Sequence, residues 1–267
     1  MRIGFALLVL LGCAQTTNLL NPGSPSFSGS FAPATTDSVA HAELRIVTFN
    51  IKLSRRIDGA IEVLGNDSLR GADVLALQEM DEVGVERIAR ALKLNYVYYP
   101  SSIHPVDQKY YGPALLSPWP IERSWKLILP HAGRIRHQRR TATAAVLRVR
   151  GERILAYAVH LETQLRISDA AREDQVRTIF TDAAGFKGPV VIAGDFNSQG
   201  IGPFLVHHGF SWVTERIGPS ISFFSWDHIF VRNLSPAQLL GAGVVKDVRG
   251  ASDHRPVWAV VGQPGVI

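Results

Sequence analysis

Cysteine is nearly absent from this chain. A single cysteine, Cys13, occurs among the 267 residues, so no intramolecular disulfide can form. The glycine-rich patterns Gly-x-Gly-x-x-Gly and Gly-x-x-x-x-Gly-Lys-Ser/Thr are missing as well, which argues against a nucleotide-cradling loop. The only cysteine, Cys13, follows an apolar N-terminal stretch, so the predicted folded domain has no cysteine nucleophile.

The apolar stretch at the N-terminus, residues 3–11, is too short to span a bilayer. It follows Arg2 and has the length of a signal peptide. The sequence Leu10-Leu11-Gly12-Cys13 resembles the lipobox of bacterial lipoprotein signals, in which the cysteine is acylated and becomes the new N-terminus. We interpret residues 1–13 as such a signal and Cys13 as the lipidation site. Cleavage after Ala14 and an incidental apolar N-terminus are the alternatives.

The lipobox resemblance implies an exported protein that is lipid-anchored in the bacterial cell envelope. Several acyl chains on one residue are sufficient for stable anchoring. Ala14, not Asp, follows the cysteine, and in lipoprotein signals this does not direct retention in the inner membrane. We therefore expect the outer membrane, on its periplasmic or surface face.

Residues 14–42 are rich in Ser, Pro, Gly and Thr. Such a composition buries too little apolar area to order itself, so it predicts a flexible tether. The remaining residues, 43–267, form the predicted catalytic domain, without internal repeats.

The overall composition is that of an ordinary globular protein, with 46% hydrophobic and 19% charged residues. The length allows one large α/β domain with a substantial core. The net charge of +5 favours anionic partners such as nucleic acid, phospholipid or phosphorylated metabolites, without choosing among them.

Apolar runs that end in turn residues predict a strand-rich domain. We expect strands at residues 44–51, 73–79, 95–99, 112–117, 121–129, 141–149, 153–160, 188–198, 225–231, 241–248 and 255–261. Helices are expected at residues 57–65, 83–94 and 168–184. Helices alternate with strands in the first half and hairpins occur throughout, which favours an α/β sandwich of mixed sheets over a purely parallel sheet.

The central strand, residues 188–198, ends on Gly194-Asp195-Phe196-Asn197. If the extended geometry persists, Asp195 and Asn197 leave the same face of the strand. A carboxylate and an amide oxygen suit Mg²⁺, Ca²⁺ or Mn²⁺ better than zinc. A simple turn that ends the strand is the alternative.

Other predicted strands also end on, or begin with, residues that carry chemistry. Asn50, Glu79 and His160 end strands, Asp227 begins one, and Asp253-His254 precedes the last strand. Each residue alone could be a turn, rim or surface residue. Their shared position is informative, because layered α/β enzymes build their sites at strand ends.

Six short motifs occur in an order that resembles the endonuclease/exonuclease/phosphatase superfamily, which includes deoxyribonuclease I. They are Thr48-Phe49-Asn50-Ile51, Leu77-Gln78-Glu79, Val159-His160-Leu161-Glu162, Gly194-Asp195-Phe196-Asn197, Trp226-Asp227-His228-Ile229-Phe230-Val231 and Ser252-Asp253-His254-Arg255-Pro256. The resemblance covers residues 44–261. It implies a four-layer α/β sandwich, in which two packed mixed β-sheets are flanked by helices.

The resemblance also implies roles for these residues. Glu79 resembles the principal Mg²⁺ ligand, with Asn50 beside it, and Asp253 resembles a further carboxylate on the metal side; Mn²⁺ and Ca²⁺ are alternatives to Mg²⁺. Asp195 and Asn197 resemble the pair that holds the phosphate and the attacking water.

Two histidines complete the set that the resemblance implies. His254 resembles the essential histidine and Asp227 the carboxylate that orients it. His160 resembles a second histidine, which binds the phosphate or protonates the leaving oxygen. Tyr111 lies near the position where relatives place a phosphate-contacting Tyr or a His-orienting Glu, and Arg140 resembles a phosphate-contacting Arg. Both are expected to bind substrate.

The chemistry is consistent without the resemblance. Hydrolysis of a phosphate ester places negative charge on phosphoryl and leaving oxygens, and a divalent cation with two imidazoles offsets it. An Asp227–His254 pair fixes the imidazole tautomer. We expect direct attack by water, with either Asp195 or His254 taking its proton.

The expected function is a divalent-metal-dependent phosphodiesterase of nuclease type, acting as a monomer. The net charge and the basic run at residues 134–140 favour nucleic acid over phospholipid as substrate. A sphingomyelinase-like phospholipid phosphodiesterase, a phosphomonoesterase and a non-catalytic binding lipoprotein are the alternatives, in that order.

Overall fold

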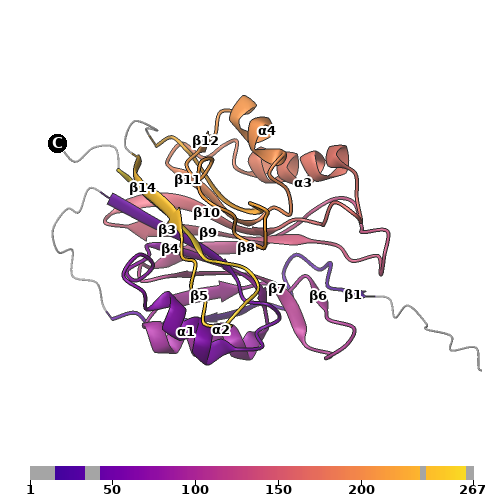
Figure 1. Ribbon diagram of the computed structural model, residues 1–267, viewed down its shortest axis with the longest axis horizontal. Coiled ribbons are helices and arrows are strands. Elements are labelled where there is room, and N and C mark those ends of the chain that lie inside the picture. Colours follow the sequence, from indigo (N-terminus) through magenta and orange to yellow (C-terminus); the bar gives the residue numbers. More distant parts are fainter. Residues whose placement is uncertain (1–15, 34–42, 235–238, 263–267) are drawn as a thin grey trace, which may run out of the picture.

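Two β-sheets packed face to face form the centre of the molecule, and helices cover their outer faces (Figure 1). The computed structural model describes residues 16–33, 43–234 and 239–262. The predicted α/β fold, a sandwich of two packed mixed sheets flanked by helices, is confirmed. No helix among the described residues is both long and apolar enough to cross a membrane.

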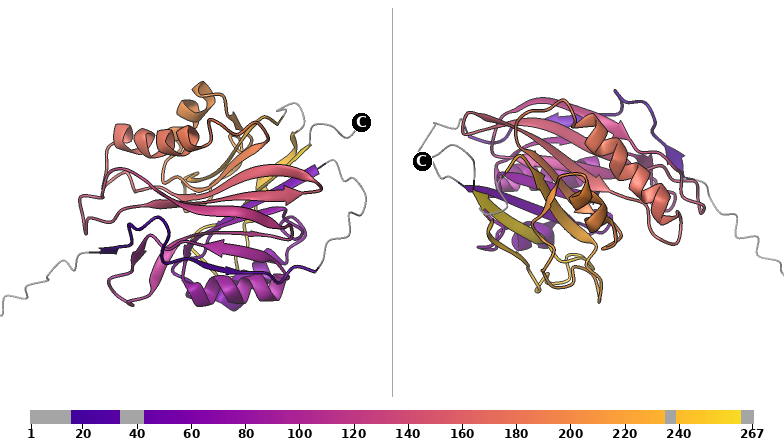
Figure 2. Two further views of the ribbon diagram at one scale, coloured as in Figure 1. Left: turned by 180° about the vertical axis from the view of Figure 1, so that it is seen from behind. Right: turned by 90° about the horizontal axis from the view of Figure 1, so that it is seen from above.

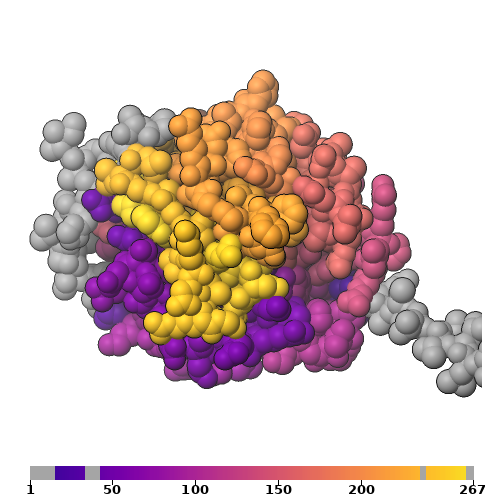
Figure 3. All heavy atoms as spheres, in the orientation of Figure 1, coloured from indigo at the N-terminus to yellow at the C-terminus, as the bar shows by residue number. Residues whose placement is uncertain are grey.

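The first sheet has nine strands and contains the amino-terminal part of the chain. Its strands are β1 (Thr17–Asn18), β2 (Phe27–Gly29), β3 (Glu43–Asn50), β4 (Val74–Met80), β5 (Asn95–Tyr98), β6 (Ser102–Ile103), β7 (Tyr110–Ser117), β14 (Leu239–Val244) and β15 (Val257–Gly262). The order is β1-β6-β7-β4-β3-β15-β14, with β5 paired to both β2 and β7. In the space-filling view the yellow C-terminal part lies against the indigo part, as the β3–β15 pairing requires (Figure 3).

The second sheet has six strands. They are β8 (Ile121–Ile128), β9 (Thr141–Val149), β10 (Glu152–His160), β11 (Val190–Asp195), β12 (Ser211–Trp212) and β13 (Asp227–Arg232), in the order β12-β13-β11-β10-β9-β8. The predicted hairpin is β9–β10, and β10 and β11 run parallel. The central strand β11 is thus flanked on both sides.

Four helices complete the layers, as the two further views also show (Figure 2). The helices α1 (Ile57–Leu64) and α2 (Glu82–Leu92) cover the first sheet, and α3 (Asp169–Asp182) and α4 (Ile201–His207) cover the second (Figure 1). Side-chain caps begin two of them, since Asp81 accepts from the Gly84 amide and Ser168 from the Ala171 amide. The sequence analysis missed α4 and the four short strands β1, β2, β6 and β12.

Strands buried on both faces explain the continuous apolar runs of the sequence. In β11, Val191 and Ala193 face the core between the sheets, whereas Val190 and Ile192 face the core under α3 and α4. Each face therefore takes every second residue, and neither face needs polar ones.

The prediction of a flexible tether over residues 14–42 is wrong for residues 16–33. Here β1 pairs with β6 and β2 pairs with β5, so the segment extends the first sheet. The buried Lys126 secures it by donating from Nζ to the carbonyls of Leu19 and Ser24, at 3.0 and 2.9 Å.

Composition misled the prediction because the stabilising contacts of this segment are non-local. Phe27 stacks on Tyr98 and Phe31 on Tyr96, with ring centroids 5.9 and 6.2 Å apart. The polar backbone between them pairs with sheet edges. The rest of the predicted tether, together with the predicted signal and Cys13, lies outside the described residues.

Candidate active site

Most of the predicted site residues, which lie at or near strand ends, line one cavity. It has a volume of about 250 Å³ and is lined by seven of the predicted site residues: Glu79, Tyr111, Arg140, His160, Asp195, Asn197 and His254. Sheet register brings them together, because His160 pairs with Asp195 across β10–β11 and Asp195 pairs with Asp227 across β11–β13. Asn50, at the end of β3, reaches the same place from the opposite sheet.

His254 lies between two buried carboxylates. Its Nδ1 is 2.8 Å from Asp227 Oδ2, and its Nε2 is 3.7 Å from Asp195 Oδ2. Burial opposes the charged imidazole, yet Asp227 and Asp195 outweigh burial and raise the pKa of His254 to about 10. His254 is therefore an imidazolium at neutral pH, with its Nε2 toward the cavity.

Asp195 is a buried carboxylate held in place by donors. It accepts from the side-chain amide of Asn50 at 3.1 Å and from the backbone amide of Asn197 at 2.8 Å. Burial, followed by repulsion from Asp227, raises the pKa of Asp195 to about 7. A carboxylate with such a pKa is suited to accept a proton near neutral pH.

Glu79 is presented by an irregularity in its strand. The register of β4 against β7 shifts between Leu77 and Met80, and Glu79 has a φ of 59°. Such a bulge redirects a side chain that regular alternation would place elsewhere. Its carboxylate accepts from Asn50 Nδ2 at 3.2 Å and from the Leu53 amide at 3.1 Å.

The charges and ligand types of this region fit a divalent cation. The carboxylates of Glu79, Asp195 and Asp227 all raise the pKa of one imidazole, that of His254. Asp227 Oδ1 is buried and has no hydrogen-bond partner among the described residues. Carboxylate and amide oxygens are hard ligands, so a cation of the Mg²⁺ type fits the donor set at Glu79 and Asn50.

Ligand atoms of Asp195, Asp227 and His254 lie within 4.8 Å of one another, a spacing at which three residues could hold one metal ion. The 2.8 Å bond between His254 and Asp227 is instead the arrangement of a histidine oriented by a carboxylate.

His160 is held by a chain of hydrogen bonds from Tyr111 and Arg140. Arg140 Nη1 donates to the Tyr111 hydroxyl at 3.0 Å, and that hydroxyl lies 3.3 Å from His160 Nδ1. We assign the Tyr111 hydrogen to Nδ1 and the imidazole proton to Nε2, because Nε2 then faces the Asp195 carboxylate, whose Oδ2 is 3.5 Å away. Burial, and then the positive charge of Arg140, lowers the pKa of His160 well below its ordinary value.

Glu162 anchors this chain, and the sequence analysis did not select it as a site residue. Its carboxylate accepts hydrogen bonds from Arg140 Nε and Nη2 at 3.3 and 3.2 Å, and both side chains are buried. Burial would raise the pKa of Glu162, but Arg140 outweighs it and the pKa is lowered. Its place in the motif Val159-His160-Leu161-Glu162 was the available signal.

Two predicted residues take positions different from those expected. Asn197 has a φ of 51°, so the extended geometry ends before it, and its side chain donates to the Leu161 carbonyl at 3.0 Å. Asp253 pairs with Lys52 at 2.9 Å, is 47% exposed, and does not line the cavity.

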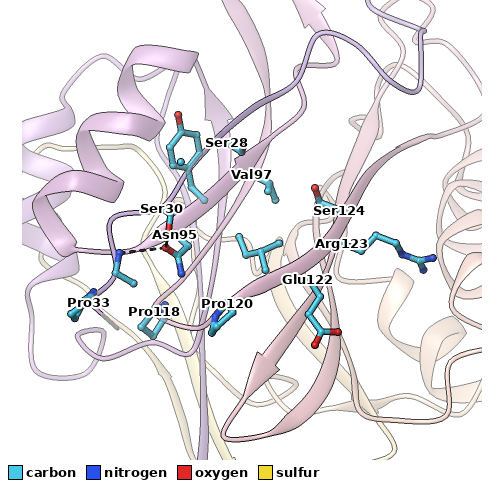
Figure 4. Close-up of a pocket in the computed structure, with 14 residues that line it drawn as sticks. Ser28, Ser30, Pro33, Asn95, Val97, Pro118, Pro120, Glu122, Arg123 and Ser124 are labelled. Atoms are coloured by element: carbon cyan, nitrogen blue, oxygen red, sulfur yellow. Dashed lines mark hydrogen bonds between the residues drawn. The ribbon is translucent and has the colours of Figure 1, made fainter. Parts of the chain in front are cut away.

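A larger cavity, of about 790 Å³, lies between β2, β5 and the start of β8 (Figure 4). It shares no residue with the catalytic cavity. Its polar contacts are structural, such as the 2.7 Å bond from Ser30 to Asn95. Its Glu122 is engaged by Arg148 and Arg153. Size alone therefore does not locate the chemistry.

Comparison with known proteins identifies a family and several solved structures of similar fold. The sequence profile of the Endonuclease/Exonuclease/phosphatase family matches residues 47–254. No curated protein matches the chain.

Solved structures share the fold at low identity. An endonuclease/exonuclease/phosphatase from Beutenbergia cavernae DSM 12333 has a TM-score of 0.66 and 19% identity, covering 84% of this chain and 72% of that one. D. rerio TDP2 complexed with single strand DNA product has a TM-score of 0.64 and 19% identity, covering 82% and 98%. Sphingomyelinase C from Streptomyces griseocarneus has a TM-score of 0.61 and 19% identity, covering 82% and 99%.

Proposed function

Because the chain belongs to the endonuclease/exonuclease/phosphatase family, whose members are phosphoester hydrolases, we propose that it is a divalent-metal-dependent phosphodiesterase in which water attacks directly. The observation that carries the proposal is the meeting of Glu79 and Asn50 with Asp195 and His254 at one cavity. Among the described residues, which do not include Cys13, no serine or cysteine lines that cavity.

Glu79 and Asn50 are the proposed holders of Mg²⁺, with Mn²⁺ or Ca²⁺ as alternatives. A divalent cation at this position supplies positive charge that offsets the charge developing on the phosphoryl oxygens. The Glu79 carboxylate is oriented by Asn50 Nδ2 and by the Leu53 amide. Asn50 Oδ1 accepts from the Lys52 amide, so the Asn50 side chain would have to turn its amide to offer this oxygen to a cation beside Glu79.

Asp195 is the proposed acceptor of the water proton. A protonated His254 has no free lone pair, whereas Asp195 Oδ2 lies beside both histidines of the cavity. His254, oriented by Asp227, then supplies a charged donor to the phosphoryl group. Neutral His160 donates its Nε2 proton to a phosphoryl oxygen.

The test is hydrolysis of bis(p-nitrophenyl) phosphate with and without Mg²⁺. We expect EDTA to abolish the activity, and Glu79→Ala, Asp195→Ala and His254→Ala to lower kcat by about 100-fold or more each, since each removes charge stabilisation or proton transfer. Asp253→Asn is the matched control, because this carboxylate is next to His254 but outside the cavity.

Activity that survives EDTA, or an unchanged rate in His254→Ala, contradicts the mechanism. A loss in Asp253→Asn as large as in Glu79→Ala would instead restore Asp253 to the metal site that the sequence assigned to it.

We also propose that Cys13 is acylated and anchors the protein in the cell envelope, on the strength of the Leu10-Leu11-Gly12-Cys13 sequence. Incorporation of labelled palmitate that is lost in Cys13→Ser tests this. The proposed state is a monomer, because one chain supplies every side chain of the site; sedimentation tests it.

The residues of the cavity do not choose the phosphodiester, because they address the phosphate that all such substrates share. Among the proteins that share this fold, one is named for single strand DNA product and another for sphingomyelin. The choice for this chain depends on the surface around the cavity.

A further inference from the structure

Exposed apolar side chains lie on loops that also contribute residues to the catalytic cavity, or that are bridged to one. We call them the apolar rim: Val106, Ile135, Leu165 and Phe223, which are 72%, 51%, 90% and 94% exposed. Three of them directly follow or precede a residue that lines the cavity, namely Pro105, Arg136 and Arg166. The rim therefore belongs to several separate loops that meet at one opening.

Phe223 is held outward by the backbone. Ile221 and Phe224 exchange hydrogen bonds of 3.0 and 2.7 Å, which makes Phe223 part of the tip of a tight turn. Ile221 is bridged to His254, so the turn stands beside the catalytic cavity. Arg255 donates to the Pro219 carbonyl at 2.9 Å and fixes its base.

Arginines alternate with these apolar tips. Arg134 and Arg136 flank Ile135, and Arg166 follows Leu165. Among the described residues no carboxylate forms an ion pair with Arg134 or Arg136, whereas Arg166 Nη1 lies 3.7 Å from Glu162 Oε1. Uncompensated guanidinium groups bind phosphates, and apolar tips between them gain free energy by entering a headgroup and acyl boundary. A nucleic acid would provide phosphates for the arginines but no acyl region for the apolar tips.

The N-terminal segment leads to the same mouth. Thr16 lines the cavity, and its amide donates to the Arg136 carbonyl at 3.0 Å. Cys13 precedes Thr16 by three residues, a distance that an extended chain spans in about 10 Å. If Cys13 is acylated as proposed, its acyl chain is attached within that distance of Thr16.

From these observations we propose that the mouth is a membrane-docking surface and that the substrate is a phospholipid in an anionic bilayer. The inference rests on the proposed phosphodiesterase function. Water forms a new bond from its oxygen to phosphorus and passes a proton to Asp195. One ester bond from phosphorus to oxygen breaks, and the leaving oxygen takes the Nε2 proton of the His254 imidazolium to become an alcohol. The proton held by Asp195 then returns to His254, whose Nε2 lies 3.7 Å from Asp195 Oδ2.

The experiment compares binding with catalysis on the chain from residue 14 onward, which lacks Cys13 and retains every described residue. Binding is measured by co-sedimentation with vesicles of phosphatidylglycerol and phosphatidylcholine, and catalysis by release of phosphorylated or alcohol headgroup from them. The rim variant is Leu165→Ser with Phe223→Ser. The matched control is Val83→Ser with Val206→Ser, which are exposed apolar residues on α2 and α4.

We expect the rim variant to lose vesicle binding by about tenfold or more, because two large apolar groups no longer enter the bilayer. Headgroup release should fall in parallel, whereas hydrolysis of bis(p-nitrophenyl) phosphate stays unchanged, and the control pair keeps all three. Arg134→Gln should weaken binding to anionic vesicles and not to pure phosphatidylcholine.

Hydrolysis of the soluble diester without vesicle binding overturns the docking inference and leaves the proposed function standing. Plasmid nicking that falls with Arg134→Gln, without headgroup release, also overturns it in favour of nucleic acid. Failure to hydrolyse any diester in the presence of Mg²⁺ contradicts the proposed function. Vesicle binding is measured separately from hydrolysis, so the docking inference is tested in that case too.

Discussion

Tyr111 decides which nitrogen of His160 carries the proton. Arg140 donates to the Tyr111 oxygen, and in our assignment the Tyr111 hydroxyl donates to His160 Nδ1, which lies 3.3 Å away. A carboxylate in this position would favour the charged imidazole, whereas a hydroxyl that donates favours the neutral one. Arg140, which the sequence assigned to substrate binding, acts here through Tyr111 with its charge compensated by Glu162.

The first prediction concerns Tyr111→Phe. Without the donor to Nδ1, the tautomer of His160 is no longer fixed, so kcat should fall by about 10- to 100-fold with KM nearly unchanged. Steady-state kinetics measure the effect, and ¹⁵N NMR of the histidine side chains reports the tautomer. Tyr110→Phe is the control, and equal losses in both variants would contradict the role of Tyr111.

His228 is a buried histidine kept neutral by its surroundings. Trp212 donates to its Nδ1 at 3.3 Å, and Nε2 has no partner among the described residues. Burial lowers the pKa of His228 from 6.5 to about 4. The unfolded chain thus takes up a proton at a pH where the folded chain does not, so stability falls as the pH falls.

The second prediction follows from that difference. Between pH 6.5 and pH 4 the protonation of His228 should remove about 3 kcal/mol from the free energy of unfolding. In His228→Gln this part of the pH dependence should vanish, as measured by urea unfolding at several pH values. The exposed His137 serves as the control in His137→Gln. An unchanged slope in His228→Gln would refute the assignment.

At the scale of elements, the parallel pair β10–β11 determines how the site is assembled. Its register sets Val159 opposite Gly194 and His160 opposite Asp195. A Cβ on Gly194 would lie 2.0 Å from the Val159 carbonyl oxygen, so only glycine allows the two strands to approach this closely.

The third prediction is that Gly194→Ala separates these strands. The overlap with Val159 should lower the free energy of unfolding by about 2 kcal/mol or more and displace Asp195 from His160, so activity should fall further than stability explains. Thermal unfolding and diester hydrolysis measure both effects. Gly185→Ala, where a Cβ has no neighbour within 4 Å, should change neither.

At the scale of the whole molecule, residues 16–33 join the catalytic unit instead of tethering it. They lie against both β5 and β6, and their first residue reaches the cavity. This arrangement covers edges of the first sheet that would otherwise be open to pairing with other chains.

The fourth prediction is that removal of these residues destabilises the molecule. The chain from residue 34 onward should lose about 2–4 kcal/mol of unfolding free energy relative to the chain from residue 14, because Tyr98 and Tyr96 lose the rings of Phe27 and Phe31 that stack on them. If the shorter chain does not fold, Phe27→Ala with Phe31→Ala provides the milder variant. Equal melting temperatures would support a passive tether.

The sequence by itself determined the fold class and the family. Strands buried on both faces leave long apolar runs, and the turn residues that follow them mark strand ends, so both features are local and readable. The chemistry-bearing residues Asn50, Glu79, His160 and Asp195 were visible for the same reason, since each ends a strand.

Only the tertiary structure decided what these residues contact. The bulge that presents Glu79, the pairing of Arg140 with Glu162, the exposure of Asp253 and the docking of residues 16–33 all depend on atoms far apart in the sequence. Composition and periodicity report the preferences of a segment for itself. A charge, a tautomer or a sheet edge is settled by its neighbour in space, which the linear pattern does not contain.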